Sequence, residues 1–176
     1  VAENGELVDT TGFPASPPPA PTMNLDPASL DFRLPVEGKR VRVIEIVPEQ
    51  IITRSIVAEA RIQDGRVVSD PDRDLLKIAV VDRHSGTGRT AAAFVKGLGL
   101  KQGAIASSVA HDAHNIIVAG TSDADMRAAA AAVVEMKGGF AVICDGNTLA
   151  ALPLPVAGLM SDQPVATVRQ RMDAAI

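Results

Sequence analysis

The chain has 176 residues, a formal net charge of -4 at pH 7 and a hydrophobic fraction of 47%, which suits one medium domain with a buried core. Aromatic residues make up only 2%, which disfavours stacking on nucleic-acid bases, and the acidic balance offers no basic field to a phosphate backbone or an anionic membrane. We therefore expect neither nucleic acid nor a membrane as a partner. The single Cys144 cannot form an internal disulfide, so the cytoplasm is the expected compartment.

The N-terminal part differs in composition from the rest of the chain. Residues 1–12 contain an Asn4-Gly5 pair between short apolar stretches, which is typical of a tight hairpin. Six of the 12 prolines fall within residues 13–28, where fixed φ angles and missing N–H groups favour an extended linker. The pattern of a globular domain begins at residue 29 and continues to residue 176.

The first part of that domain predicts antiparallel hairpins. Residues 39–47 and 51–62 are rich in β-branched residues, which predicts two antiparallel strands joined near Pro48. Asp64-Gly65 predicts a second tight turn. Residues 75–81 are nearly all apolar, which is typical of a central strand covered on both faces.

Two units in which a helix precedes a strand are predicted next. Residues 90–97 have a helical composition and lead through a glycine turn to a strand over 104–109. Residues 123–137 form the second helix, and a strand over 140–144 follows it. The two units resemble a degenerate repeat. With the hairpins before them, they predict an α+β fold in which helices pack on a mixed sheet.

The helix over 123–137 has the clearest local signals. Ser122 and Asp125 form a capping box at its start, and Lys137 followed by a glycine is typical of its end. Its apolar residues recur on one face at helical spacing. A last amphipathic helix is predicted from Pro164 onward.

Polar residues gather where two predicted strands end. One group follows the strand over 75–81, and the other, residues 111–115, follows the strand over 104–109. All three histidines of the chain lie in these two groups. Ligands usually bind beyond the carboxyl ends of strands in layered α/β structures. Six residues are candidates for a role in the site, either as lining of a substrate pocket or as hydrogen-bond partners of metal ligands. They are Arg83, His84, His111, Asp112, His114 and Asn115.

His111 and His114 are also the candidates for a metal bound by this chain alone, because two imidazoles three residues apart can face one ion. Two histidines do not complete a site, and Cys144 and Asp82 are the other obvious donors. Three interpretations stay open: a metal site, a loop that faces a ligand or an interface, and histidines that only hydrogen-bond within the fold.

Two further motifs are weak. Residues 85–88, Ser-Gly-Thr-Gly, allow a phosphate-binding loop before a helix, but they lack the spacing and the Lys of a nucleotide loop. An ordinary strand-to-helix turn capped by Thr87 or Thr90 is the simpler interpretation. A Ser-His-Asp triad from Ser107 or Ser108 with His111 and Asp112 is disfavoured, because neighbouring side chains diverge along a loop.

Three separated blocks carry a family resemblance. They are residues 74–88, with Asp-Leu-Leu-Lys-Ile-Ala-Val-Val-Asp-Arg-His at their start; residues 94–115, which end in Ala-His-Asp-Ala-His-Asn; and residues 152–162, with Leu-Pro-Leu-Pro-Val-Ala-Gly-Leu-Met-Ser-Asp. In this order they closely resemble the C-terminal domain of bacterial adenine deaminases. The similarity runs through most of residues 30–165.

The resemblance implies a parent enzyme of the amidohydrolase superfamily. Such an enzyme has a (β/α)₈ barrel with a metal centre, a small flanking β-sandwich and this additional α+β domain. The implied reaction is hydrolysis of adenine to hypoxanthine and ammonia by water that a divalent metal (manganese, iron or zinc) activates, with a carboxylate moving the proton. Adenine, the catalytic barrel and further copies in a homo-oligomer are the implied partners.

The chain departs from the family because it carries no His-x-His metal motif of the barrel. The resemblance therefore implies that residues 1–12 are the end of the flanking β-sandwich, residues 13–28 the bridge, and residues 29–176 the C-terminal domain. The chain begins at Val1 rather than Met, so we expect a fragment that is inactive alone. The alternative function is a non-catalytic ligand-binding or oligomerisation domain, in which the apolar surface of the helices meets a partner.

Overall fold

A computed structural model describes residues 2–3, 6–7, 20 and 22–174. Strands β1 (Ala2–Glu3) and β2 (Glu6–Leu7) pair antiparallel, with Ala2 opposite Leu7. The predicted Asn4-Gly5 turn between them lies outside the described residues, as does most of the predicted linker.

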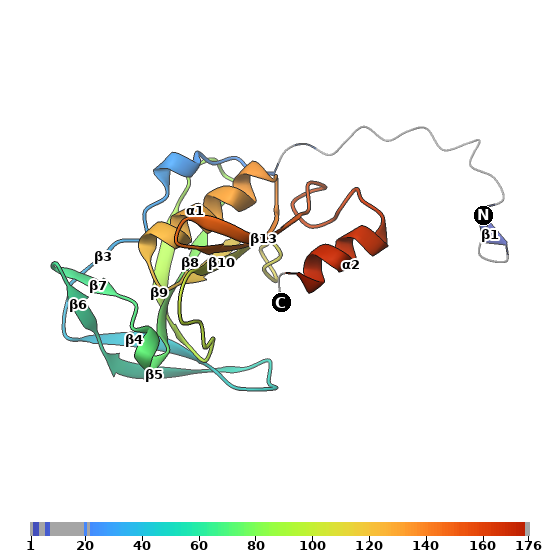
Figure 1. Cartoon of the computed structure of the whole chain (residues 1–176). Helices are drawn as coiled ribbons and strands as arrows, with labels where there is room; N and C mark the ends of the chain where they lie inside the picture. The colour runs from blue at the N-terminus through green and yellow to red at the C-terminus, as the bar shows by residue number, and fades with distance from the viewer. Residues whose placement is uncertain (1, 4–5, 8–19, 21, 175–176) are drawn as a thin grey trace.

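The main sheet has eight strands in the order β13-β12-β10-β11-β8-β9-β4-β5 (Figure 1). All neighbours pair antiparallel except β4 and β9, which run parallel, so the sheet is mixed. Two α-helices, α1 (Asp123–Glu135) and α2 (Val165–Asp173), complete the predicted α+β fold, which is confirmed. The strands are β4 (Arg40–Ile46), β5 (Thr53–Glu59), β8 (Leu75–Val81), β9 (Thr90–Lys96), β10 (Ala104–Ser107), β11 (Ile116–Gly120), β12 (Gly139–Cys144) and β13 (Asn147–Pro153).

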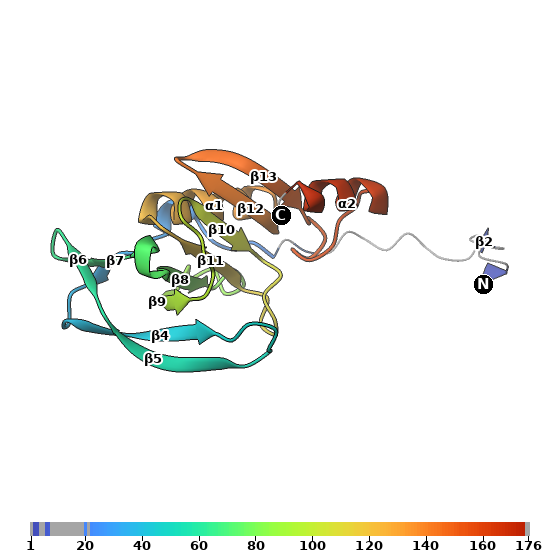
Figure 2. The same ribbon diagram turned by 60° about the horizontal axis from the view of Figure 1, so that its bottom comes forward.

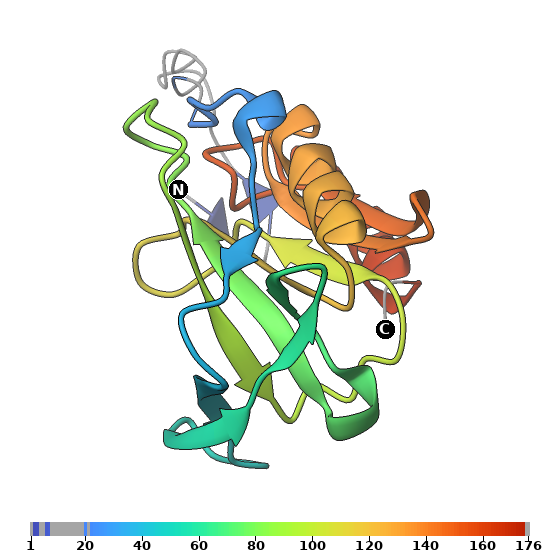
Figure 3. The same ribbon diagram turned by 90° about the vertical axis from the view of Figure 1, so that its left-hand side faces the viewer.

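A small sheet and two short 3-10 helices lie beside the main sheet. Strands β3 (Leu34–Pro35), β7 (Arg66–Val68) and β6 (Arg61–Gln63) form it in that order, and the 3-10 helices are η1 (Pro27–Ser29) and η2 (Pro71–Arg73). Both predicted hairpins are confirmed, because β4 pairs with β5 and β6 pairs with β7. The chain passes from β5 in one sheet to β6 in the other after a break at one residue (Figure 3).

The predicted helix over 90–97 is wrong, because these residues form strand β9. It pairs antiparallel with β8 along its whole length, from Val81 opposite Thr90 to Leu75 opposite Lys96, and parallel with β4 at its end. Alanine favours a helix by less than 1 kcal/mol per residue, and hydrogen bonding to two strands outweighs that preference. The two units therefore do not repeat, and residues 82–89 are a hairpin loop with no helix behind them.

Helix α1 is confirmed and covers one face of strands β10, β11 and β12. Ser122 accepts a hydrogen bond from the Asp125 N–H at 3.1 Å, as the capping box predicts. At the other end Lys137 has a φ of 63°, and its N–H donates to the Val134 carbonyl at 2.9 Å. The apolar residues between these ends are buried against the sheet: Met126, Ala129, Ala130 and Val133.

The segment before β3 belongs to the same core. Leu30 and Phe32 are buried beside α1, and Met23 and Leu25 pack against them. The Asn24 N–H donates to the Arg83 carbonyl at 2.8 Å. Residues 23–25, which we expected to belong to the linker, therefore contact the domain.

Strand β8 is central, as predicted, and its face away from α1 is covered at Leu76 but not at Val80. Ala79 and Val81 are buried on the α1 side, whereas Val80 on the other side is 41% exposed. Lys77 is 1% exposed, and its ammonium group contacts the Asp123 carboxylate at 2.5 Å, which ties β8 to the start of α1. The predicted last helix is α2, where Val165 is exposed; residue 176 lies outside the described residues. Among the described residues, no helix has the length and apolar character that crossing a membrane requires.

Candidate functional site

The two predicted polar loops leave the same edge of the main sheet. Val81 at the end of β8 lies opposite both Thr90 and Ile116, so the hairpin loop 82–89 and the loop 108–115 start side by side (Figure 3). Gly139 lies opposite Pro153, which brings residues 154–163 to the same place. We call this end of the sheet the loop edge.

Arg83 joins the segments that meet at the loop edge. It is 1% exposed, and its guanidinium donates to the carbonyls of His114 at 2.5 Å, Thr22 at 3.1 Å and Ala157 at 3.1 Å. It also donates to the Thr22 hydroxyl. Burial lowers the pKa of Arg83, because the charged form loses contact with water. Its side chain faces the interior, where it holds the loops in place.

Asp82 organises its own loop. Its carboxylate accepts hydrogen bonds from the backbone N–H groups of His84 at 2.9 Å and Ser85 at 3.2 Å, and from the hydroxyls of Ser85 and Thr87. These bonds, the Ser85 hydroxyl foremost, lower the pKa of Asp82 to about 2. The Asp82 carboxylate, which was expected as a possible metal donor, therefore accepts hydrogen bonds within its own hairpin loop.

The second loop carries the candidate polar cluster. The side chains of His111 and Asp112 are 87% and 98% exposed and contact each other at 2.7 Å, and such an exposed contact contributes little to stability in water. The ring centroids of His111 and His114 lie 5.6 Å apart. His114 Nδ1 and Asn115 Oδ1 are buried and find no hydrogen-bond partner among the described residues.

The two loops contact each other directly. The ring Nε2 of His84 lies 3.1 Å from the Ala113 carbonyl, and Arg83 donates to the His114 carbonyl. The structure thus brings together all six residues that the sequence singled out. The other partners of Arg83 were not predicted, because a backbone carbonyl at Ala157 leaves no signal in the sequence.

Cys144 cannot join His111 and His114 in a metal site. Ile143 pairs with Ala104 at the start of β10, whereas the histidines follow the end of β10, so Cys144 lies at the opposite edge, about 17 Å along β12 at about 3.4 Å per residue. Burial, and then the neighbouring Asp145, raise the pKa of its thiol. In the described part of the chain, no group of three or more His, Cys, Asp or Glu residues could hold a metal.

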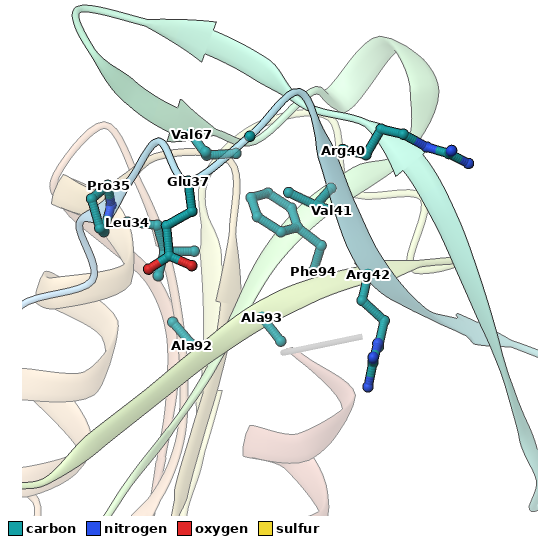
Figure 4. A pocket seen from close by; sticks show the side chains of 11 residues that line it. Leu34, Pro35, Glu37, Arg40, Val41, Arg42, Val67, Ala92, Ala93 and Phe94 are labelled. Carbon is teal, nitrogen blue, oxygen red and sulfur yellow. The ribbon is translucent and has the colours of Figure 1, made fainter.

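A separate cavity of about 510 Å³ opens between β4 and β9, away from the loop edge. Figure 4 shows Leu34, Val41 and Phe94 around it, with Arg40 pointing away from Phe94. None of the six candidate residues lines this cavity, so the cavity is separate from the candidate site.

Comparison with known proteins identifies the family. The family model described as "Adenine deaminase C-terminal domain" matches residues 50–175. This chain belongs to that family. The match takes in β5 and everything after it, including the whole loop edge, so the adenine deaminase C-terminal domain is the unit that presents both loops.

Curated relatives named adenine deaminase align over most of this domain. The protein of Desulfatibacillum aliphaticivorans is 49% identical over 163 residues, which are 91% of this chain and 29% of that protein. The protein of Oleidesulfovibrio alaskensis is 55% identical over 73% of this chain and 22% of its own length. The protein of Methanothrix thermoacetophila is 44% identical over 100% of this chain and 31% of its own length. The chain thus spans about three tenths or less of these relatives.

Proposed function

We propose that this domain supports the hydrolysis of adenine to hypoxanthine and ammonia by a full-length adenine deaminase. In this proposal a catalytic barrel of the amidohydrolase type carries out the reaction, and the loops 82–89 and 108–115 approach the mouth of that barrel. Residues 1–12 would end the flanking β-sandwich and residues 13–28 would bridge to this domain. The full-length enzyme would be a homo-oligomer of the cytoplasm that acts in purine metabolism.

One observation supports the proposal that these loops approach the catalytic barrel. Arg83 is buried with all three of its guanidinium nitrogens bonded to three separate segments, which fixes the backbone beneath His114. On that fixed backbone, His114 Nδ1 and Asn115 Oδ1 have no partner. Buried polar atoms are normally hydrogen-bonded, so the pair is suited to receive a group from the catalytic barrel or from adenine.

The divalent metal of the proposed reaction does not fit the residues of this domain. His111 and His114 offer two imidazoles, and His111 already contacts Asp112; a hydrolytic site needs three or more protein ligands. We therefore assign the metal (manganese, iron or zinc) to the catalytic barrel. Within this domain His111, Asp112, His114 and Asn115 shape the substrate pocket or orient metal ligands through hydrogen bonds, while Arg83 and His84 position that loop.

Ammonia release from adenine tests the assignment directly. We expect the full-length protein to release ammonia and this 176-residue chain to release none, because the described residues include no group of ligands that could hold a hydrolytic metal. Release would be followed with a coupled ammonia assay, alongside elemental analysis of both proteins. Turnover by the short chain, or an inactive but metal-loaded full-length protein, would contradict the proposal.

Replacing His111 and His114 by Ala in the full-length enzyme should lower kcat about tenfold or more, the size of effect seen when groups behind a metal site are removed. The His111 side chain is 87% exposed and His114 Nδ1 makes no hydrogen bond among the described residues, so we expect the loss of both rings to lower the thermal unfolding midpoint only slightly. Steady-state kinetics with kcat and KM reported separately would measure the effect. The matched control is Glu135→Ala at the exposed end of α1, and equal kinetics for both variants would reject a site role.

A further inference from the structure

The part of the main sheet formed by β8, β10, β11 and β12 carries no charged side chain on the face opposite α1. Cross-strand pairs place Val142, Ile105, Ala119 and Ile78 in one row across β12, β10, β11 and β8, and Phe140, Ser107, Ile117 and Val80 in the next row. We call these eight residues the outer face. An antiparallel sheet with one face in water alternates apolar and polar residues, and these strands do not. Their sequence is that of strands covered on both sides.

The outer face is also hollowed. An apolar hollow of about 240 Å³ lies on it, with Ile78, Ile105, Ile117 and Phe140 among its lining residues. Leu98, from the loop after β9, is the one residue from outside the sheet that lines this hollow within the described ranges. Val80 remains 41% exposed and Ile105 38% exposed. A contiguous apolar patch of this kind marks an interaction surface.

The comparisons indicate what covers it. Relatives that align with most of this chain are about three times its length, and under the proposed function every molecule holds a catalytic part in the same polypeptide. Tethering holds such a neighbour at an effective concentration near the millimolar range. The row that contains Val80 and Ile117 lies next to the loop edge, because Asp82 follows β8 and Asn115 precedes β11. A body packed on this row would also contact the loop with His111 and His114.

We propose that the outer face is the surface on which the catalytic part of the same polypeptide packs. The proposal rests on the proposed function, which supplies that catalytic part, and it adds the surface and the direction of docking. In this arrangement β8, β10, β11 and β12 pack with their outer face on the catalytic part. The loop edge then contacts the catalytic part at one end of that interface. In Figure 2, β10 and β11 lie side by side; β10 runs toward the loop edge and β11 runs away from it.

Oxidative footprinting of the wild-type full-length protein tests this packing. Hydroxyl radicals should modify Val80 and Ile105 several-fold less than Ile62, which has a similar exposed fraction of 46% in this domain but lies on β6 in the small sheet. Peptide mass spectrometry would measure the modification of each residue. Equal modification of Ile105 and Ile62 would overturn the proposal whether or not the protein deaminates adenine.

Charge placed on the outer face gives the second measurement. Ile105→Lys in the full-length protein should raise the radius of gyration in small-angle scattering at unchanged molar mass, because a buried ammonium weakens the packing. The control Ile62→Lys should leave both values unchanged. A dimer that Ile105→Lys converts to a monomer would overturn the proposal in favour of a second copy of the chain. An unchanged radius and mass would overturn it as well.

Discussion

Replacing Arg83 by Met is expected to lower the free energy of unfolding by about 3 kcal/mol. Hydrogen bonds from a charged donor contribute roughly 1.5–3 kcal/mol each, and Arg83 makes four, to the backbone of His114, Thr22 and Ala157 and to the Thr22 hydroxyl. The methionine leaves these acceptors unpaired while it relieves the desolvation of the guanidinium, which offsets part of the loss. The remaining cost is a large fraction of the stability of an ordinary domain.

Urea unfolding followed by circular dichroism would measure this change, with Arg127→Met as the control. Arg127 lies on the exposed side of α1, where such a substitution changes stability by about 0.5 kcal/mol or less. Equal midpoints for the two variants would show that Arg83 does not hold the loop edge together. In the full-length enzyme, Arg83→Met should also reduce turnover, since the backbone under His114 loses its support.

Replacing Gly139 by Ala is expected to destabilise the domain by about 4 kcal/mol, or to prevent folding. Gly139 has a φ of 133°, and a Cβ there would lie 1.9 Å from the Leu152 carbonyl oxygen of β13. This backbone conformation costs an alanine roughly 1–3 kcal/mol, and displacing the neighbouring strand adds about 1–3 kcal/mol. Gly139 also accepts from the Ser108 N–H at 3.0 Å, so the shift would reach the loop that carries His111.

Alanine substitutions at two other glycines distinguish the backbone cost of a positive φ from the steric cost of the contact with β13. At Gly146 φ is 75° and nothing lies within 4 Å of an added Cβ, so Gly146→Ala measures the backbone cost alone, about 1–2 kcal/mol. At Gly38 there is neither a positive φ nor a near neighbour, and Gly38→Ala should be neutral or slightly stabilising. We expect the thermal unfolding midpoint to be highest for Gly38→Ala, lower for Gly146→Ala and lowest for Gly139→Ala. A midpoint for Gly139→Ala equal to that of Gly146→Ala would contradict the steric argument.

Much of the fold could be predicted from local patterns. The two hairpins, strand β8 and helix α1 with its capping residues were predicted within a few residues of their observed ends. Strands β11 and β13 were not predicted, and β9 was predicted as a helix. Its run of three alanines is compatible with either state, and the choice depends on β8 and β4, which are distant in sequence.

The sequence indicated where the candidate residues lie better than it indicated what each of them does. His84, His111, Asp112, His114 and Asn115 do meet at one edge of the sheet, as their positions after strands indicated. Arg83 was grouped with them as a pocket residue, but its guanidinium is buried on backbone carbonyls. Cys144 was considered as a ligand partner and lies at the other end of β12.

The sequence by itself determined the family, helix α1 and the apolar character of both faces of the central strands. These follow from residues in adjacent turns of one helix or along one strand, because helical bonds join residues four apart and strand faces alternate every two. Tertiary structure alone decided that residues 90–96 are a strand, that Arg83 is enclosed, and which sheet face stays uncovered. Each depends on pairing between segments tens of residues apart, and such pairing is set by the energy of the whole packed arrangement.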